Sequence, residues 1–175
     1  MNSKDILYSR GKNDECYTLD YGVAPILQYI PKDAVIWCPF DREDSEFVKQ
    51  ITAHGNKVIF SHIGYGQDFY QYEPDGDWDI IISNPPFTGK RGIFDRALSF
   101  NKPFALLCSA TWLNDAAPVQ LFTKHRKNMQ LLMFDNRMRF CNNGDVQGKI
   151  TFKSIYMCCD FLPQQIVLEH LEVPK

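Results

Sequence analysis

The chain has 175 residues, of which 45% are hydrophobic. That length allows one well-buried domain and is short for two, so we expect a single domain over residues 1–175. A formal net charge of −2 argues against a protein that coats duplex nucleic acid nonspecifically, although a local basic cluster could still bind phosphates. No stretch approaches the roughly 20 apolar residues of a membrane span, and the polar start is unlike a signal peptide. We therefore expect a cytoplasmic protein without membrane association.

From residue 35 onward, short apolar runs alternate with segments of helical pattern, which is typical of a mostly parallel sheet covered on both faces. Strands are predicted at residues 35–38, 57–61, 79–83, 104–110, 129–134 and 151–161. Helices are predicted at residues 44–54, 92–100 and 114–127. Asp44 or Ser45 is expected to cap the first helix and Gly55 to end it. With the last strand taken as antiparallel, the fold class is α/β, with a doubly wound, Rossmann-like sheet that binds ligands beyond the carboxyl ends of its strands.

The six cysteines form no CxxC pair, and the adjacent Cys158 and Cys159 could not readily bridge each other. Most of the thiols are expected to be reduced and buried. A zinc site built from Cys141, Cys158, Cys159 and His170 would match none of the common zinc spacings, so we expect no metal.

The most informative motif follows the predicted strand at residues 79–83 and consists of Asn84, Pro85, Pro86 and Phe87. Two prolines hold the backbone extended and remove two amide donors, which leaves a loop rich in acceptors. Phe87 sets an aromatic plane beside those acceptors, as needed to hold a planar ring that carries an amine. The alternative is a proline-stiffened turn with Phe87 packed into the core.

This run, read as D-I-I-I-S-N-P-P-F, resembles the catalytic motif of amino-methyltransferases that use S-adenosylmethionine, especially the adenine N6 DNA methyltransferases. The order of its parts is similar to that of small enzymes of this family from phages or mobile elements. The resemblance implies a methyltransferase fold, S-adenosylmethionine as cofactor, and a flipped-out adenine as substrate. The adenine amine would donate to the Asn84 side-chain oxygen and the Pro85 carbonyl, while Phe87 stacks on the ring.

Further segments resemble the family's cofactor contacts. Tyr17 and Thr18 match the N-terminal segment that contacts the methionine end, although they could equally be an aromatic anchor and a helix cap. Asp68 and Phe69 match an element in which the carboxylate accepts from the cofactor's adenine amine and the aromatic ring packs on it. Asp68 could instead be a solvated loop residue. His62 stands where relatives place an acid for the ribose hydroxyls, and it can donate to a hydroxyl.

The loop after the first strand departs from the family pattern. Pro39 and Phe40 match it, but Arg42 and Asp44 occupy the glycine positions that let the backbone approach the cofactor. Asp41 is a candidate partner for the methionine ammonium. The acids of this loop could equally favour the positive N-terminus of the helix that follows.

Basic and aromatic residues near the motif are candidate contacts to nucleic acid. Lys90 and Arg91 lie just beyond the catalytic loop, and Arg137 and Arg139 lie near the end of a later strand, where they could face phosphates. Phe152 is a candidate aromatic wall of the base pocket, with core packing as the alternative.

The sequence therefore predicts methyl transfer to the N6 amine of adenine in DNA. No target-recognition domain is expected beyond the loop at residues 140–150, so we expect a single-stranded or distorted DNA substrate, or a partner subunit that supplies target recognition. The loss of the glycines keeps open a catalytically silent nucleic-acid-binding or accessory protein. RNA adenine, cytosine N4 and a protein amide remain possible acceptors, and a small-molecule enzyme would leave the Asn-Pro-Pro-Phe loop unexplained.

Overall fold

The computed structural model describes residues 16–142, 145–146, 148 and 150–175. Its strands are β1 (Tyr17–Thr18), β2 (Val35–Cys38), β3 (Lys57–Phe60), β4 (Ile80–Ser83), β5 (Phe104–Ser109), β6 (Gln130–Phe134), β7 (Phe140–Asn142), β8 (Asp145–Val146), β9 (Ser154–Cys159) and β10 (Ile166–Glu169). Its helices are α2 (Asp20–Leu27), α3 (Glu46–Ala53), α4 (Lys90–Ser99) and α5 (Ala117–His125), with 3-10 turns η1 (Ile63–Tyr65) and η2 (Ala110–Asn114).

Seven strands of the described chain form one sheet in the order β10-β6-β9-β5-β4-β2-β3. All neighbours pair in parallel except β9, which is antiparallel to both β5 and β6. The predicted α/β class, mostly parallel sheet and antiparallel strand near the C-terminus are thereby confirmed.

The antiparallel strand is not the last one, because β10 follows it and pairs in parallel with β6 at the sheet edge. The sequence analysis did not predict β10. Its run Ile166–Leu168 is apolar like that of β4, but Ile166 and Leu168 are 53% and 76% exposed, so this edge strand buries little apolar surface.

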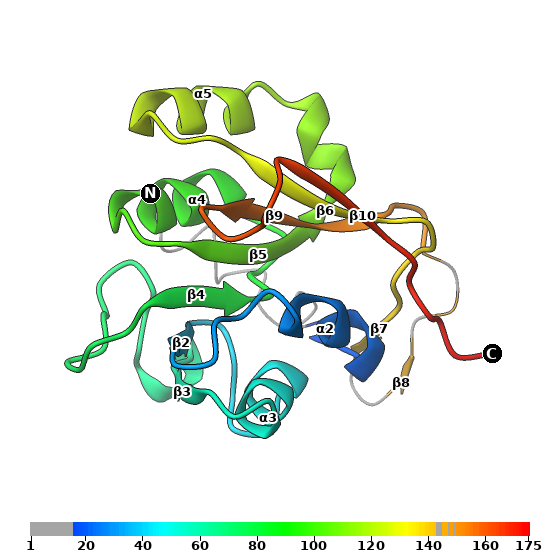
Figure 1. Ribbon diagram of the computed structural model, residues 1–175, viewed down its shortest axis with the longest axis horizontal. Coiled ribbons are helices and arrows are strands. Elements are labelled where there is room, and N and C mark those ends of the chain that lie inside the picture. Colours follow the sequence, from blue (N-terminus) through cyan, green and yellow to red (C-terminus); the bar gives the residue numbers. More distant parts are fainter. Residues whose placement is uncertain (1–15, 143–144, 147, 149) are drawn as a thin grey trace.

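Residues that alternate along each central strand enter two separate cores. Ile36 and Cys38 pack in the layer of α2 and α3, whereas Trp37 between them packs in the layer of α4 and α5. Figure 1 shows the two pairs of helices on opposite sides of the sheet. Because both faces are buried, these strands read as continuous apolar runs and not as alternating ones.

Local signals set the helix ends. The Ser45 hydroxyl accepts from Val48 N over 3.3 Å and caps α3, and Gly55 beyond its end has φ of 103°, as predicted. The helix predicted from residue 114 begins only at Ala117, since residues Ala110–Asn114 form η2 first. None of the helices in the described ranges is long and apolar enough to cross a membrane.

A second, small sheet of order β1-β7-β8 was not predicted. It pairs Tyr17 with Cys141 and Thr18 with Phe140 in antiparallel register. Strands of two or three residues carry no periodic signal in a sequence. This pairing fixes β1 beside the carboxyl ends of the main strands, where the candidate site lies.

Candidate active site

A cavity of about 310 Å³ lies where the loops after β2, β3 and β4 meet β1. The chain runs from β2 to β3 on one side and then returns to β4 on the other side of β2, so the strand order reverses at β2. Doubly wound sheets bind their ligands beyond the carboxyl ends of the strands at such a reversal. The cavity is also of the size of small-molecule sites.

Most residues singled out in the sequence come together here. The loop after β4 that was predicted to hold a base, called the base loop below, lines the cavity with its four residues Asn84, Pro85, Pro86 and Phe87. So do seven expected to contact a cofactor, namely Tyr17, Thr18, Pro39, Phe40, Asp41, His62 and Phe69. Arg42 and Ser45 also line the cavity, and the wall is completed by residues that the sequence analysis had not singled out, namely Cys16, Glu46, Phe47, Ile63, Gly64 and Gln67.

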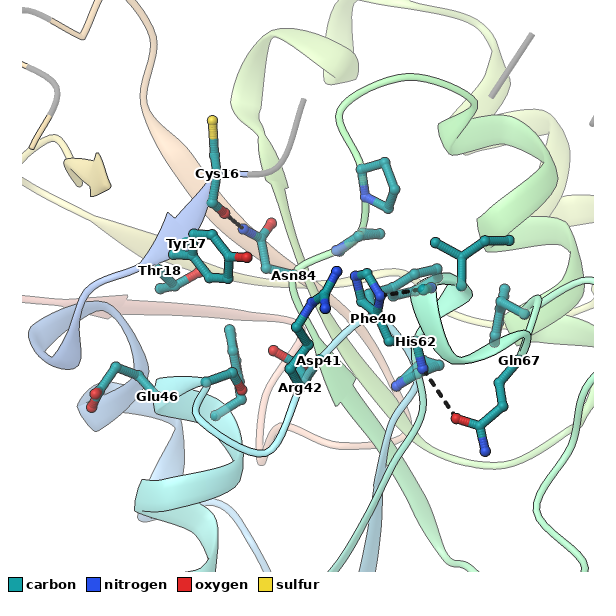
Figure 2. Close-up of a pocket in the computed structure, with 18 of the residues that line it drawn as sticks. Cys16, Tyr17, Thr18, Phe40, Asp41, Arg42, Glu46, His62, Gln67 and Asn84 are labelled. Carbon is teal, nitrogen blue, oxygen red and sulfur yellow. Dashed lines mark hydrogen bonds between the residues drawn. The ribbon is translucent and has the colours of Figure 1, made fainter. Parts of the chain in front are cut away.

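The orientation of Asn84 is set by the main chain just before β1. Its Nδ2 donates to the Cys16 carbonyl over 3.1 Å, as the dashed line in Figure 2 marks. Its Oδ1 is buried and has no hydrogen-bond partner among the described residues. A buried acceptor left unsatisfied costs about 1–3 kcal/mol, so this oxygen favours a donor that enters the cavity.

Phe87 is positioned by neighbours on two sides. Its ring meets Phe140 and Phe152 edge-on, with centroids 5.8 Å and 6.0 Å away. Its carbonyl accepts from Lys90 Nζ over 2.6 Å. Phe87 therefore packs against the core and also lines the cavity.

Asp41 brings a buried carboxyl group to the cavity. Its Oδ2 accepts from the Ser83 hydroxyl over 2.5 Å. Burial raises the pKa of Asp41 to about 6, and hydrogen bonds from the Ser83 and Ser45 hydroxyls partly offset that rise. An acid with this pKa is largely ionised at neutral pH and can receive an ammonium group.

Of the predicted pair Asp68 and Phe69, only Phe69 lines the cavity. Phe69 reaches the wall, where its ring lies 4.9 Å from that of Phe40. Asp68 is not part of the lining, and its Oδ1 accepts from Tyr70 N over 3.0 Å in a local turn. Gln67 lines the cavity in its place, and its Oε1 accepts from His62 N over 3.4 Å.

The candidate nucleic-acid contacts lie outside this cavity. Arg91 donates to Gln120 Oε1 over 3.0 Å on the surface of α4. Arg137 and Arg139 line a second hollow of about 500 Å³ together with Lys175, and Arg137 Nη1 donates to the Ile150 carbonyl over 3.0 Å. Three positive side chains thus gather on one surface, separate from the cavity that holds Asn84.

Four of the six thiols belong to the core. Cys38, Cys108, Cys158 and Cys159 are buried and form no disulfide, as expected. Burial raises the pKa of each, which makes them unreactive at neutral pH. In the part of the chain that the structure describes, no group of three or more His, Cys, Asp or Glu side chains could hold a metal ion.

No protein-family model matches the sequence, and no match among curated proteins is significant. A precorrin-6y C5,15-methyltransferase from Geobacter metallireducens GS-15 aligns with a TM-score of 0.48 and 11% identity over 85% of this chain and 94% of that one. A protein assigned as an RNA methyltransferase from Pyrococcus horikoshii aligns with a TM-score of 0.40 and 15% identity over 90% and 80%.

A modification subunit assigned to a type I restriction enzyme of Vibrio vulnificus YJ016 aligns with a TM-score of 0.56 and 11% identity. The alignment covers 98% of this chain and 50% of that subunit, so the chain spans half of the subunit's length. At this identity the match concerns the fold alone. The chain therefore has the Rossmann-like α/β fold that its sequence predicted, shared with the Vibrio subunit.

Proposed function

We propose that this protein transfers a methyl group from S-adenosylmethionine to the exocyclic N6 amine of adenine in DNA. The observation that carries the proposal is Asn84 Oδ1, a buried acceptor without a partner in the described chain, which lines a cavity beside Pro85 and Phe87. The Cys16 carbonyl holds the other end of the same amide, so the oxygen and not the nitrogen is offered to a ligand.

The base loop would act by positioning. The adenine amine donates to Asn84 Oδ1 and to the Pro85 carbonyl, and Phe87 stacks on the ring. Both acceptors stabilise the positive charge that develops on nitrogen, so no side-chain base is needed before transfer. When bound, S-adenosylmethionine would supply an electrophilic methyl group to the amine nitrogen, with sulfur keeping the electron pair of the bond that breaks and the amine proton leaving to solvent.

The remaining wall fits the cofactor chemically. Thr18 Oγ1 is a second buried polar atom without a hydrogen-bond partner among the described residues, and it lines the same cavity. Asp41 suits an ammonium group, and Phe40 and Phe69 suit a purine face. Tyr17, Pro39 and His62 complete the proposed cofactor wall. Asp68 stays a proposed contact only if its turn rearranges when the cofactor binds.

Nucleic acid would be held by positive charge outside the cavity. Arg137 and Arg139, with Arg91 on α4, are the proposed phosphate contacts, and Phe152 supports the base pocket through Phe87. With so small a contact surface, single-stranded or distorted DNA is the expected substrate. A cytoplasmic location is part of the same proposal. The Vibrio protein is a subunit of an assembly, which supports a partner that supplies target recognition.

One observation favours a second function. Arg42 brings a positive charge into the cavity at a position where the family pattern has glycine. If that side chain excludes the cofactor, the protein is a catalytically silent nucleic-acid-binding or accessory protein.

The test combines titration calorimetry with S-adenosylmethionine and transfer of labelled methyl groups to single- and double-stranded oligonucleotides. Oligodeoxynucleotides with adenine should be methylated, whereas RNA and adenine-free DNA with cytosine should not. Asn84→Ala should lower methyl transfer about 100- to 1,000-fold and leave cofactor affinity within about threefold of the wild type.

The exposed Asn128→Ala is the matched control and should keep full activity. Methyl transfer by Asn84→Ala at the wild-type rate would contradict the site. No detectable binding of S-adenosylmethionine by the folded protein would favour the silent protein.

A further inference from the structure

Arg42 has not closed the cavity but has placed a charge inside it. The side chain is half-buried and lines the wall, and Figure 2 shows the guanidinium extending between Asn84 and His62. The turn after β3 makes room for it, because a Cβ at Gly64 would lie 3.0 Å from Arg42 Nη2. The arginine that stands at a glycine position of one loop is thus accommodated by a glycine in the next loop.

The turn η1 also positions the donors around Arg42. The guanidinium carbon lies 5.6 Å from the centroid of the Tyr65 ring, within the range of a cation–π contact. Gly64 N donates to His62 Nδ1 over 2.9 Å, so a neutral His62 carries its proton on Nε2. Arg42 and His62 together make this side of the cavity rich in hydrogen-bond donors.

The opposite charge comes from the preceding residue. Asp41 is buried on the same wall, held by the Ser83 hydroxyl. One loop therefore offers a carboxylate and a guanidinium from consecutive residues. This pair complements a ligand end that carries an ammonium and a carboxylate close together, and an α-amino acid carries both on one carbon.

We infer that Arg42 binds the α-carboxylate of the cofactor's methionine end while Asp41 receives its ammonium group. The inference rests on the proposed function and makes Arg42 a specificity-determining residue. The ammonium and the sulfonium of S-adenosylmethionine are both repelled by a guanidinium, so the favourable orientation brings the carboxylate to Arg42. Charge-assisted hydrogen bonds from Arg42 then replace the backbone approach that a glycine loop provides.

The test measures the affinities of S-adenosylmethionine and of decarboxylated S-adenosylmethionine by titration calorimetry. The wild type should bind the decarboxylated ligand about 10- to 100-fold more weakly. Arg42→Gln should bind the two ligands within about threefold of each other, and Arg42→Lys should keep part of the difference. Lys57→Gln removes an exposed cation at the opposite end of β3 and should keep the wild-type ratio.

Two results with folded variants would overturn the assignment. An unchanged ratio in Arg42→Gln would place the carboxylate elsewhere. Tighter binding of both ligands by Arg42→Gly would make Arg42 an obstruction. If the folded wild type bound neither ligand, the proposed function itself would fail, and the inference with it.

Discussion

The loops after β4 and β2 reach one cavity from neighbouring strands, but they are built differently. The β4 loop follows the family pattern, and its prolines and the Cys16 carbonyl fix an acceptor in place. The β2 loop has Arg42 and Asp44 at the expected glycine positions, and it presents Asp41 and Arg42 to the cavity. Backbone rigidity thus defines the wall proposed to hold the base, called the base side, whereas charged side chains define the wall proposed to hold the cofactor, called the cofactor side.

The largest effect on stability is expected at Asp41, on the cofactor side. The pKa of Asp41 is raised from 3.8 to about 6 by burial, so the folded protein binds this proton more tightly than the unfolded chain does. The resulting stabilisation is complete below pH of about 4 and is lost as pH rises through about 6, a change of roughly 3 kcal/mol at most. Asp41→Asn should abolish that part of the pH dependence in chemical denaturation from pH 4 to 8.

Asp77→Asn, at an exposed position, controls for the loss of one charge and should keep the wild-type profile. A profile for Asp41→Asn that parallels the wild type would contradict this assignment. Cofactor affinity should respond with the opposite sign and rise with pH through about 6, because an ammonium binds the ionised form of Asp41.

On the base side, Phe87→Leu should weaken binding of the oligonucleotide and leave binding of the cofactor unchanged. Leucine keeps apolar packing against Phe140 and Phe152 but offers no aromatic face to a base. The KM for the oligonucleotide should rise about 10-fold because one stacking contact is lost, with cofactor affinity unchanged. Steady-state kinetics and calorimetry measure the two quantities separately, and a weakened cofactor affinity would mean that the two sides are not independent.

Lys90→Met tests whether the Lys90 ammonium contacts the Phe87 carbonyl or a DNA phosphate. Its ammonium donates to the Phe87 carbonyl, so its loss should loosen the base loop and lower turnover about 3- to 10-fold. The salt dependence of DNA binding should stay the same, because the ammonium is engaged with the main chain. A shallower salt slope in Lys90→Met would show instead that Lys90 neutralises a phosphate.

The smallest effect is expected on DNA binding from a change at Arg139, which lies outside the cavity. Arg139→Gln should weaken DNA binding only about two- to fivefold and reduce the slope of log affinity against log salt by about 0.7 to 0.9. Lys32→Gln removes a different exposed cation and should leave the slope unchanged. Equal salt slopes for wild type and Arg139→Gln, measured by fluorescence anisotropy, would show that the second hollow does not contact DNA.

The sequence by itself determined the central strands and the loops at their carboxyl ends. The strand predicted at residues 35–38 has those bounds, and the one at 79–83 begins one residue later. Ser45 and Gly55 marked the ends of α3 correctly. These signals are local: apolar runs, a capping hydroxyl, a left-handed glycine and two prolines act within a few residues of themselves.

Which of the candidate site residues line the same cavity, and how their side chains are oriented, follows from tertiary contacts alone. The Cys16 carbonyl fixes the amide of Asn84, 68 residues away, through a strand too short to predict. Gly64 admits the Arg42 side chain from another loop, and the Asp68 carboxylate turns to its own backbone and away from the cavity. Such contacts depend on which distant segments the sheet brings together. The local sequence around each residue does not predict them.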